Sequence, residues 1–328
     1  MNATDPASNA NDGFPHRLIA RFAGDLAKLW PEGSRLGLAV SGGPDSLALL
    51  LLAEAVLPGR VEVATVDHGL RPEATGECSM VKELCAGHGI PCEMLKVEVQ
   101  SGNLQDRARA ARYAVMGQWM KRRGLGALAT AHHADDQAET LLMRLNRGSG
   151  VAGLAGVRAR GVVPGTKLTL LRPVLGWRRS ELREVIDLAG LSPALDPSNE
   201  DERFDRVKMR KNLADADWIN PVALAASAAH LTEAEQTIEW ATTREWKERV
   251  TVSEGEIRYR PETPRLIVMR IVIRAIRMLG GDPRGGAAAR LVARLRQGKD
   301  ATLGGVVVRI SGSEWVFRKE PARRVQGQ

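Results

Sequence analysis

The stretch from Leu36 to Leu52, LGLAVSGGPDSLALLLL, constrains the fold of this chain more than any other part. It begins as a short apolar run, passes through a glycine-containing turn and continues as a leucine-rich segment typical of a buried helix. A strand that leads through a tight turn into a helix exposes backbone N–H groups, which bind phosphate well. We therefore predict a strand at 36–40, a helix at 47–57 and a phosphate-binding turn at 41–46.

The residues of this turn suit a phosphate, with one exception. Gly42 and Gly43 have no side chain to block its approach and can adopt positive φ, and Pro44 suits the first turn of a helix. Asp45 is the exception, because a carboxylate repels phosphate unless a cation lies between them, and it therefore indicates Mg²⁺ bound with a nucleotide. The turn has neither the Gly-Lys-Ser/Thr of a Walker A loop nor a G-x-G-x-x-G fingerprint, and an ordinary strand-to-helix turn is the alternative. The predicted phosphate contacts are Ser41, Gly42, Gly43, Pro44, Asp45 and Ser46.

Short apolar runs alternate with helical segments through the first two thirds of the chain. Further strands are predicted at 60–66, 92–97, 126–130 and 168–171, and helices at 16–30, 74–88, 103–123 and 179–189. This alternation is typical of an α/β protein with a doubly wound parallel sheet. Ligands bind such sheets just past the carboxyl ends of the strands. The glycine-rich segment 147–165 is predicted to be a flexible loop over the site or a structural connection.

The pattern changes after residue 217, which predicts a second domain. A helix at 221–250 repeats Leu224, Leu231 and Ile238 every seven residues, as a packed connecting helix does. Helices at 263–279 and 286–297 and strands at 305–310 and 314–318 follow, and the inward residues predicted for the first of these helices are Leu266, Met269, Val272, Ile273, Ile276 and Leu279. We predict a disordered lead at 1–15, an α/β domain at 16–217, and at 218–328 the connecting helix with a small basic α+β domain.

The positive charge of the chain is concentrated near its end. Of a net charge of +8, residues 258–328 carry 16 Lys and Arg against 5 Asp and Glu. Such an arginine-rich region suits contacts with a phosphate backbone.

The 3 cysteines contain no C-x-x-C pair, so a metal or iron–sulfur site is not predicted. The polar N-terminus and the lack of an apolar run of about 20 residues predict a cytoplasmic protein that does not span a membrane.

The segment 132–140, HHADDQAET, is the second informative cluster. On a helix, Asp135 and Asp136 lie four and three positions before Glu139, so these carboxylates project to nearly one side. Neighbouring carboxylates repel one another and need a cation, a metal ion or a proton. On spacing alone, His132 and Asp136 could ligate a metal. The alternative is a solvated acidic helix start, which the helix dipole favours.

A set of short motifs carries a family resemblance. In chain order they are SGGPDS at 41–46, DHGLR at 67–71, RAARY at 109–113, HHADDQAET at 132–140, RGSG at 147–150, RP at 172–173 and DPSN at 196–199. A basic segment follows the last of them. With these motifs the whole chain resembles the tRNA(Ile)-lysidine synthetases, which are PP-loop ATP pyrophosphatases. The set covers roughly residues 36–211 and is far more specific than any one motif.

The resemblance implies a two-step reaction on a CAU anticodon. ATP adenylates the 2-oxo oxygen of the wobble cytidine, and the ε-amine of free lysine then displaces AMP to leave lysidine. It also implies a PP-loop type α/β fold, resembling the adenine-nucleotide α-hydrolases, that binds ATP and Mg²⁺ and is followed by a tRNA-binding domain. A single-stranded loop lets the wobble base be splayed out toward such a site.

The resemblance also implies roles for individual residues. Asp45 would ligate Mg²⁺ and act in catalysis, while Asp136 and Glu139 would hold the lysine. His133 would accept a proton, and Arg112, with Arg109 as a second candidate, would steady phosphate or cytidine, although both arginines could instead line a solvated helix face. The residues predicted to contact tRNA are Arg206, Lys208, Arg210, Arg270, Arg274 and Arg277.

Two other functions remain as alternatives. One is a PP-loop enzyme that thiolates a tRNA cytidine, which would be expected to carry paired cysteines. The other is a non-catalytic tRNA-binding protein on the same fold. The sequence leaves open whether the protein is a monomer or a homodimer, whether Asp135 or Asp136 faces the site, and whether 147–165 is a lid.

Overall fold

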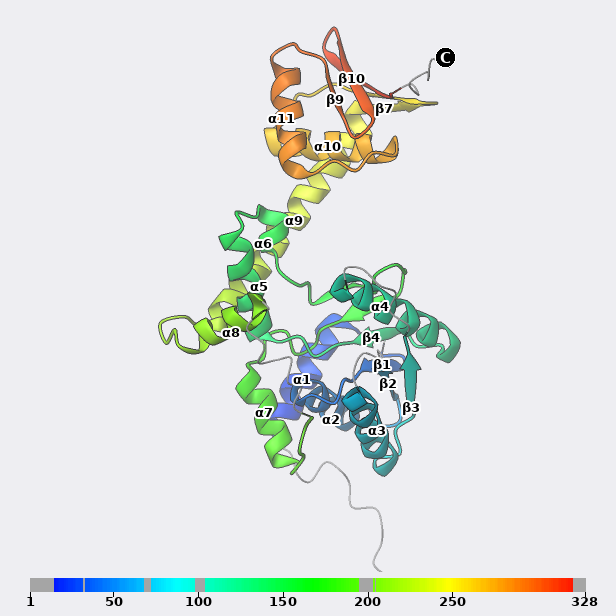
Figure 1. Ribbon diagram of the computed structural model, residues 1–328, viewed down its shortest axis with the longest axis vertical. Coiled ribbons are helices and arrows are strands. Elements are labelled where there is room, and N and C mark those ends of the chain that lie inside the picture. The colour runs from blue at the N-terminus through cyan, green and yellow to red at the C-terminus, as the bar shows by residue number, and fades with distance from the viewer. Residues whose placement is uncertain are drawn as a thin grey trace, which may run out of the picture. The chain divides into compact units, whose positions relative to one another are not determined.

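The computed structural model describes residues 15–31, 33–67, 72–97, 104–194, 203 and 205–320. The predicted lead before residue 15, the motif residues 68–71 and 196–199, and the tail from 321 lie outside these ranges. The chain forms two compact units, Met1–Thr232 and Glu233–Gln328, whose elements are labelled in Figure 1. The domain boundary expected near residue 217 stays a prediction.

A six-stranded sheet forms the centre of the first unit, in the order β3–β2–β1–β4–β6–β5. Its strands are β1 (Leu36–Ala39), β2 (Val61–Asp67), β3 (Cys92–Lys96), β4 (Ala127–Ala129), β5 (Arg160–Val162) and β6 (Thr169–Leu171). All neighbouring strands are parallel except β5 and β6. The predicted doubly wound parallel sheet is therefore confirmed, with an antiparallel edge strand that the sequence did not indicate.

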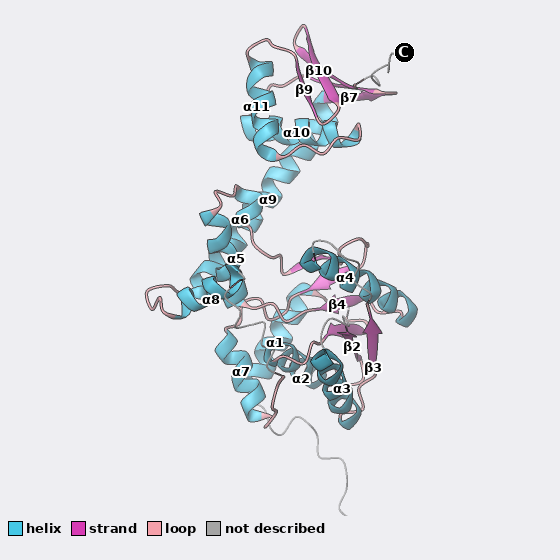
Figure 2. Cartoon of the chain, viewed as in Figure 1, coloured by secondary structure: helices cyan, strands magenta, loops and turns pink. Residues whose placement is uncertain are grey.

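Helices cover both faces of this sheet (Figure 2). The described helices between residues 15 and 250 are α1 (His16–Leu29), α2 (Pro44–Val56), α3 (Pro72–Gly87), α4 (Leu104–Arg123), α5 (Ala134–Asn146), α6 (Val151–Leu154), α7 (Arg179–Leu188), α8 (Asp205–Ala214) and α9 (Pro221–Arg249). One hydrophobic cluster joins β1 to α1, α2, α3 and α7, and a second joins the other face to α4. The leucines of α2 are almost fully buried, because this helix lies between the sheet and its neighbouring helices. Gly37 of β1 is needed for close packing of α4, since a Cβ there would lie 2.8 Å from the ring of Trp119.

The strand order places a ligand site beside β1. The sheet continues from β1 to β2 on one side and to β4 on the other, so the chain winds in opposite directions from this point. Open α/β sheets bind ligands at such a switch point, at the carboxyl ends of the strands. The turn at 41–46 follows β1 and the segment 132–140 follows β4, so the fold brings the two informative parts of the sequence to one edge.

The prediction of a flexible loop at 147–165 is wrong in part. This segment contains α6 and β5, and the side chain of Gln137 holds it by accepting from the backbone N–H of Val157 at 2.7 Å and donating to its carbonyl at 2.8 Å. The guanidinium of Arg172 also donates to the carbonyl of Arg158 at 2.5 Å. Long-range side-chain bonds of this kind are not visible as a local pattern, so the glycine content was misleading.

The second unit is built on an antiparallel sheet with the strand order β7–β8–β11–β10–β9. Its strands are β7 (Val250–Ser253), β8 (Glu256–Tyr259), β9 (Ala301–Leu303), β10 (Val306–Ser311) and β11 (Glu314–Lys319), and its further helices are α10 (Arg265–Met278) and α11 (Gly285–Arg296). The sequence predicted β10 and β11 but missed the three shorter strands. Val272 and Ile276 are buried as expected, whereas Leu266 is 41% exposed and was wrongly placed inward. No helix among the described residues is both long and apolar enough to cross a membrane.

Candidate active site

The turn at 41–46 has the geometry of an anion-binding loop. Gly42 has a φ of 85°, a left-handed conformation that favours glycine, and Pro44 opens α2 after Gly43. The backbone N–H of Ser41 donates to Oγ of Ser46 at 3.1 Å, and that hydroxyl donates to the carbonyl of Gly43 at 2.9 Å. Neither Gly42 nor Gly43 uses its N–H in a hydrogen bond to a described residue. The serines thus fix the turn, and two backbone donors stay available at the helix N-terminus.

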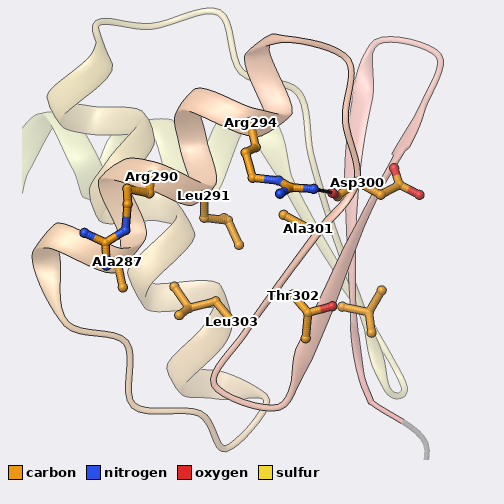
Figure 3. A pocket seen from close by; sticks show the side chains of 9 residues that line it. Ala287, Arg290, Leu291, Arg294, Asp300, Ala301, Thr302 and Leu303 are labelled. Carbon is orange, nitrogen blue, oxygen red and sulfur yellow. Dashed lines mark hydrogen bonds between the residues drawn. The ribbon is translucent and has the colours of Figure 1, made fainter.

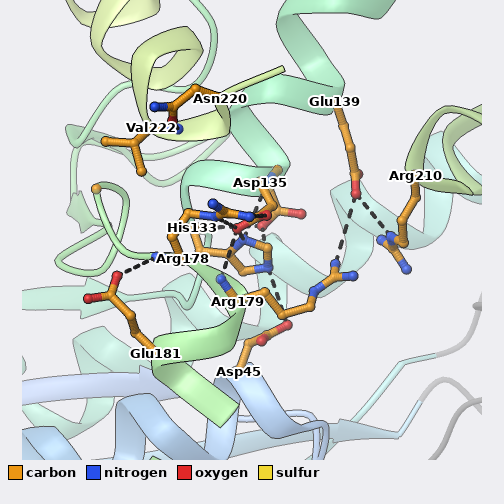
Figure 4. A network of polar contacts seen from close by, with 12 residues as sticks. Asp45, His133, Asp135, Glu139, Arg178, Arg179, Glu181, Arg210, Asn220 and Val222 are labelled. Atoms are coloured by element: carbon orange, nitrogen blue, oxygen red, sulfur yellow. Dashed lines mark hydrogen bonds and ion pairs between the residues drawn. The ribbon is translucent and has the colours of Figure 1, made fainter. Parts of the chain in front are cut away.

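Asp45 joins this turn to the second cluster. Its Oδ2 lies 3.5 Å from Nε2 of His133, whose side chain is 1% exposed, and Figure 4 shows Asp45 pointing at this imidazole from α2. Nδ1 of His133 lies 3.6 Å from Oδ2 of Asp135, and Nε2 lies 3.6 Å from Oδ2 of Asp136. The positive partner that a carboxylate in a phosphate turn requires is therefore an imidazole of the same chain, which the sequence analysis did not foresee.

These carboxylates determine the charge of His133. Burial lowers its pKa, but the contacts with Asp135 and Asp45 and the charge of Asp136 outweigh burial and raise the pKa to about 9. The N–H of Asp136 approaches Nδ1 only at 3.4 Å, which is long for a hydrogen bond. His133 is thus an imidazolium at neutral pH, and this geometry does not favour its predicted role as a proton acceptor.

Asp135 and Asp136 have different partners in the structure. Burial would raise the pKa of Asp135, but His133, the N–H of Arg179 and the guanidinium of Arg178 lower it overall. The N–H of Arg179 donates to Asp135 at 2.8 Å, so Asp135 anchors the start of α7 to α5. Asp136 instead accepts from Arg206 at 2.8 Å, and His133 and Arg206 together hold its pKa below the usual range against the effect of burial.

Glu139 lies deeper and is fully paired with arginines. Its residue is 1% exposed, and its oxygens accept from Nε of Arg206 at 2.8 Å and from Nε of Arg210 at 2.9 Å (Figure 4). Both arginines come from α8, in the basic segment predicted to contact tRNA. They point instead into the acidic cluster, so they provide the cation that these carboxylates need. Lys208 of the same helix is exposed.

The arginines Arg109 and Arg172 lie near His132 and influence its charge. Arg109 and Arg112 of α4 approach the ring of Tyr113 at 5.3 and 5.7 Å. Burial lowers the pKa of His132 to about 4, and the charges of Arg172 and Arg109 act in the same direction. His132 is therefore neutral at pH 7, and its Nδ1 lies 3.0 Å from Oγ1 of Thr130. Neither Arg109 nor Arg112 is paired with a carboxylate among the described residues.

The three α10 arginines predicted to contact tRNA belong to the second unit. Arg270 donates to both oxygens of Glu235 at 2.6 and 2.7 Å, and Arg274 lies over the ring of Trp246 at 4.5 Å. Of these three arginines, Arg277 alone has neither a carboxylate nor an aromatic partner among the described residues. The predicted face is therefore split, because two of its arginines hold α10 against α9.

The residues present fit a Mg²⁺ ion that arrives with phosphate. Oδ1 of Asp45 is buried and has no hydrogen-bond partner among the described residues. The described residues contain no cluster of three or more His, Cys, Asp or Glu that could hold a metal ion by themselves. Mg²⁺ often takes one or two carboxylates and completes its shell with phosphate oxygens and water. Asp45 can supply one such oxygen.

Comparison with known proteins places this site in a family. Residues 16–217 match the family described as a PP-loop domain. A tRNA(Ile)-lysidine synthase from Novosphingobium aromaticivorans is 48% identical over 93% of this chain and 94% of its own length. The chain belongs to the tRNA(Ile)-lysidine synthase family. A second synthase of this family, from Zymomonas mobilis, is 44% identical over 90% of this chain and 91% of its own length.

One solved structure has a fold similar to that of this chain. The U34-tRNA thiolase NcsA from Methanococcus maripaludis matches with a TM-score of 0.54 and 15% identity, over 66% of this chain and 78% of that chain. At this identity the likeness concerns the fold alone.

Some residues of the site were missed by sequence reasoning. Arg178 binds Asp135 through its Nε at 3.2 Å, although it lies 43 positions away along the chain. Arg172 is buried, and its Nε has no partner among the described residues. A signal for Arg172 existed, because the RP motif follows a predicted strand. No local pattern indicates Arg178.

Proposed function

We propose that this protein ligates lysine to the wobble cytidine of the CAU anticodon of tRNA(Ile), using ATP and releasing AMP and pyrophosphate. The similarity to a tRNA(Ile)-lysidine synthase over 93% of the chain carries this proposal. The geometry supports it, because the phosphate turn and the acidic cluster meet through the contact of Asp45 with His133. The enzyme is then a ligase that forms a carbon–nitrogen bond.

In the first step, the 2-oxo oxygen of the cytidine attacks the α-phosphorus of ATP and pyrophosphate leaves. The free N–H groups of Gly42 and Gly43 would bind the leaving pyrophosphate at the N-terminus of α2. Mg²⁺ held by Asp45 would neutralise charge on the phosphates. Because His133 is an imidazolium beside Asp45, it also reduces the negative charge that this carboxylate presents to the nucleotide.

In the second step, the ε-amine of lysine attacks C2 of the adenylated cytidine and AMP leaves. An amine attacks only after its ammonium form has lost a proton. Asp136 and Glu139 are the proposed partners of the incoming ammonium group. Both carboxylates already bind Arg206, at 2.8 Å each, so the lysine must share these oxygens with the guanidinium or displace it.

Arg112 and Arg172 are proposed to face the phosphates or the cytidine. Both are partly or fully buried, and burial is the main reason for the lowered pKa of each guanidinium. Desolvated cations of this kind stabilise developing negative charge more strongly than exposed ones. Lys208 and Arg277, which have no ion pair among the described residues, remain as proposed tRNA contacts.

The decisive assay uses labelled lysine, ATP and a tRNA transcript with a CAU anticodon. We expect label in the tRNA, with one AMP released for each lysine transferred, and no transfer to a transcript with a CAG anticodon. Absence of label from the CAU transcript under conditions where the protein binds ATP would refute the proposal. Label from a sulfur donor in place of lysine would favour the thiolating alternative.

The variant Asp136→Asn tests whether Asp136 binds the lysine substrate. The variant loses the charge that would bind the ammonium group, so we expect kcat/KM for lysine to fall about 10- to 100-fold, while ATP affinity changes little. Asp187→Asn, at an exposed carboxylate of α7, is the matched control and should behave as wild type. An equal loss of ATP and lysine binding would contradict the proposed role of Asp136.

The proposal keeps the predicted cytoplasmic location. A monomer and a homodimer are both compatible with it, and sedimentation would distinguish them.

A further inference from the structure

The second unit contains a pocket that the proposed reaction does not use. It lies between α11 and the strands β9 and β10 and has a volume of about 450 Å³ (Figure 3). Arg290 and Arg294, one helical turn apart on α11, stand at its edge, while Leu291, Leu303 and Val307 form an apolar floor. This volume lies within the range of roughly 300–1,000 Å³ that is usual for small-molecule pockets.

The arginines at this pocket are not neutralised. Several other arginines of this unit bind carboxylates, as Arg258 and Arg318 of the sheet bind Glu256 and Arg270 of α10 binds Glu235. In contrast, neither Arg290 nor Arg294 forms an ion pair with a described residue, and the one polar contact found is from Arg294 to the carbonyl of Asp300 at 3.3 Å.

The surroundings of the pocket add further positive charge. Residues 284–309 hold 6 basic side chains and a single acidic one, Asp300. The carboxylate of Asp300 accepts the N–H of Ile310 at 3.0 Å. Two guanidinium groups without an ion pair, above an apolar floor, therefore match a ligand with a phosphate and a flat, weakly polar body.

We propose that this pocket binds one unpaired nucleotide of the tRNA, with its phosphate on Arg290 and Arg294 and its base over Leu291 and Leu303. An RNA nucleotide has both required chemistries, and guanidinium planes can also stack on an exposed base. A paired base cannot enter, because its edge and faces are occupied within the helix. The inference rests on the proposed function for the identity of the RNA, and it adds a second point of contact remote in sequence from the turn at 41–46.

The test measures tRNA binding as a function of salt for Arg290→Gln/Arg294→Gln. We expect binding about 10- to 100-fold weaker than wild type, and a slope of log K against log salt that is less steep by about 0.7–0.9, as expected for one lost phosphate contact. The matched control is Lys247→Gln/Arg265→Gln, which removes the same charge from two exposed residues of this unit that form no ion pair with a described residue. An equal loss of tRNA affinity in the control would contradict the proposed pocket, because it would show that the loss comes from the removal of positive charge in general.

Two further arms test the base and the occupant. Ala287→Leu fills the pocket without changing charge, and we expect it to weaken tRNA binding several-fold while the salt slope stays as in wild type. A blunt RNA duplex of similar length should bind wild type and the double arginine variant within about twofold of each other. Unaltered binding by Ala287→Leu, or a duplex that loses as much affinity as the tRNA, would overturn the proposal.

These measurements need neither lysine nor ATP. If the protein transfers no lysine, the proposed function fails while the difference between the two double variants still decides the pocket. Circular dichroism of each variant confirms that it is folded, which the exposed positions of Arg290 and Arg294 lead us to expect.

Discussion

Glu139 illustrates how single charged residues are stabilised in this protein. It is buried in α5, and its two oxygens bind arginines that lie 67 and 71 positions further along the chain. Breaking such a buried pair leaves an uncompensated charge, which is strongly destabilising. The acidic cluster is therefore a paired network rather than a vacant anionic pocket, and any cationic substrate must enter in competition with Arg206.

His133 leads to a prediction about pH. Its pKa in the folded protein is about 9, against an ordinary value of 6.5. A group with a raised pKa stabilises the fold fully below its unfolded value, and this contribution disappears as pH rises through its folded value. We therefore expect the free energy of unfolding of wild type to fall between pH 6.5 and 9.5, by up to about 3 kcal/mol.

His133→Asn tests this effect by urea unfolding across the same pH range. Asparagine keeps a helix cap at the start of α5, but it carries no charge beside Asp45 and Asp135. The variant should be less stable than wild type at pH 6.5, and the difference should shrink toward pH 9.5. A difference that stays constant with pH would mean that His133 is not protonated in the folded state.

At the scale of elements, helix α8 carries residues of both the acidic cluster and the predicted tRNA contact. The sequence assigned Arg206 and Arg210 to tRNA, yet their side chains bind Asp136 and Glu139 of α5. Lys208 lies between them in sequence and is exposed. One face of α8 thus completes the acidic cluster, while Lys208 is exposed on the same helix.

Arg206→Gln distinguishes these two roles. Because the guanidinium neutralises Asp136 and Glu139, we expect its loss to change KM for lysine about tenfold or more, while tRNA affinity stays within about twofold. Lys208→Gln is the control with the opposite expectation, a loss of tRNA affinity with an unchanged KM for lysine. Steady-state kinetics and filter binding measure the two quantities. A weaker tRNA complex with an unchanged KM for lysine would instead support the prediction that Arg206 contacts tRNA.

The turn before α2 leads to a second prediction at this scale. Gly42 has a φ of 85°, and a Cβ there would lie 3.1 Å from the terminal methyl of Met80. Gly42→Ala should therefore lower stability by about 1–2 kcal/mol and weaken ATP binding at least about tenfold, because the N–H groups of the turn would move.

Gly59→Ala provides the control for Gly42→Ala. Gly59 also has a positive φ, of 71°, but a Cβ there would have no atom within 4 Å. This variant should lose similar stability and keep its ATP affinity, as measured by isothermal titration calorimetry. Equal ATP affinities for the two variants would contradict the proposal that the turn at 41–46 binds the nucleotide.

At the scale of the whole molecule, the two units have separate cores. The cluster of the second unit joins α10 and α11 to its antiparallel sheet and includes residues of α9 after Thr232. Arg270 and Glu235 hold α10 to α9 within this unit, and their side chains are 18% and 7% exposed. Arg270 therefore belongs to the internal structure of the unit.

Arg270→Gln tests this independence. Removing a guanidinium from a nearly buried carboxylate should destabilise the second unit by about 2–4 kcal/mol, because Glu235 loses its partner. Hydrogen exchange should become faster in α10 and in the antiparallel sheet and remain unchanged in β1 and β4. Arg277→Gln, at an exposed position, should leave exchange in both units as in wild type. Faster exchange throughout the chain would show that the units unfold together.

The sequence by itself determined the features that depend on neighbours along the chain. Most helices and strands of the first unit follow from local periodicity, the turn at 41–46 follows from the properties of glycine and proline, and the burial of α2 follows from its run of leucines. The short strands β7, β8 and β9 were missed, because three or four residues are too few to show an alternating pattern.

Only the tertiary structure decided which charges are paired. His133 beside Asp45, Arg206 on Glu139 and Arg270 on Glu235 are contacts between residues remote in sequence. The same arginine on an amphipathic helix can face a carboxylate or solvent, and its spacing is identical in both cases. Since the energy of a charge depends on its partner and its burial, the packing of the elements assigned these roles, and the sequence pattern could not.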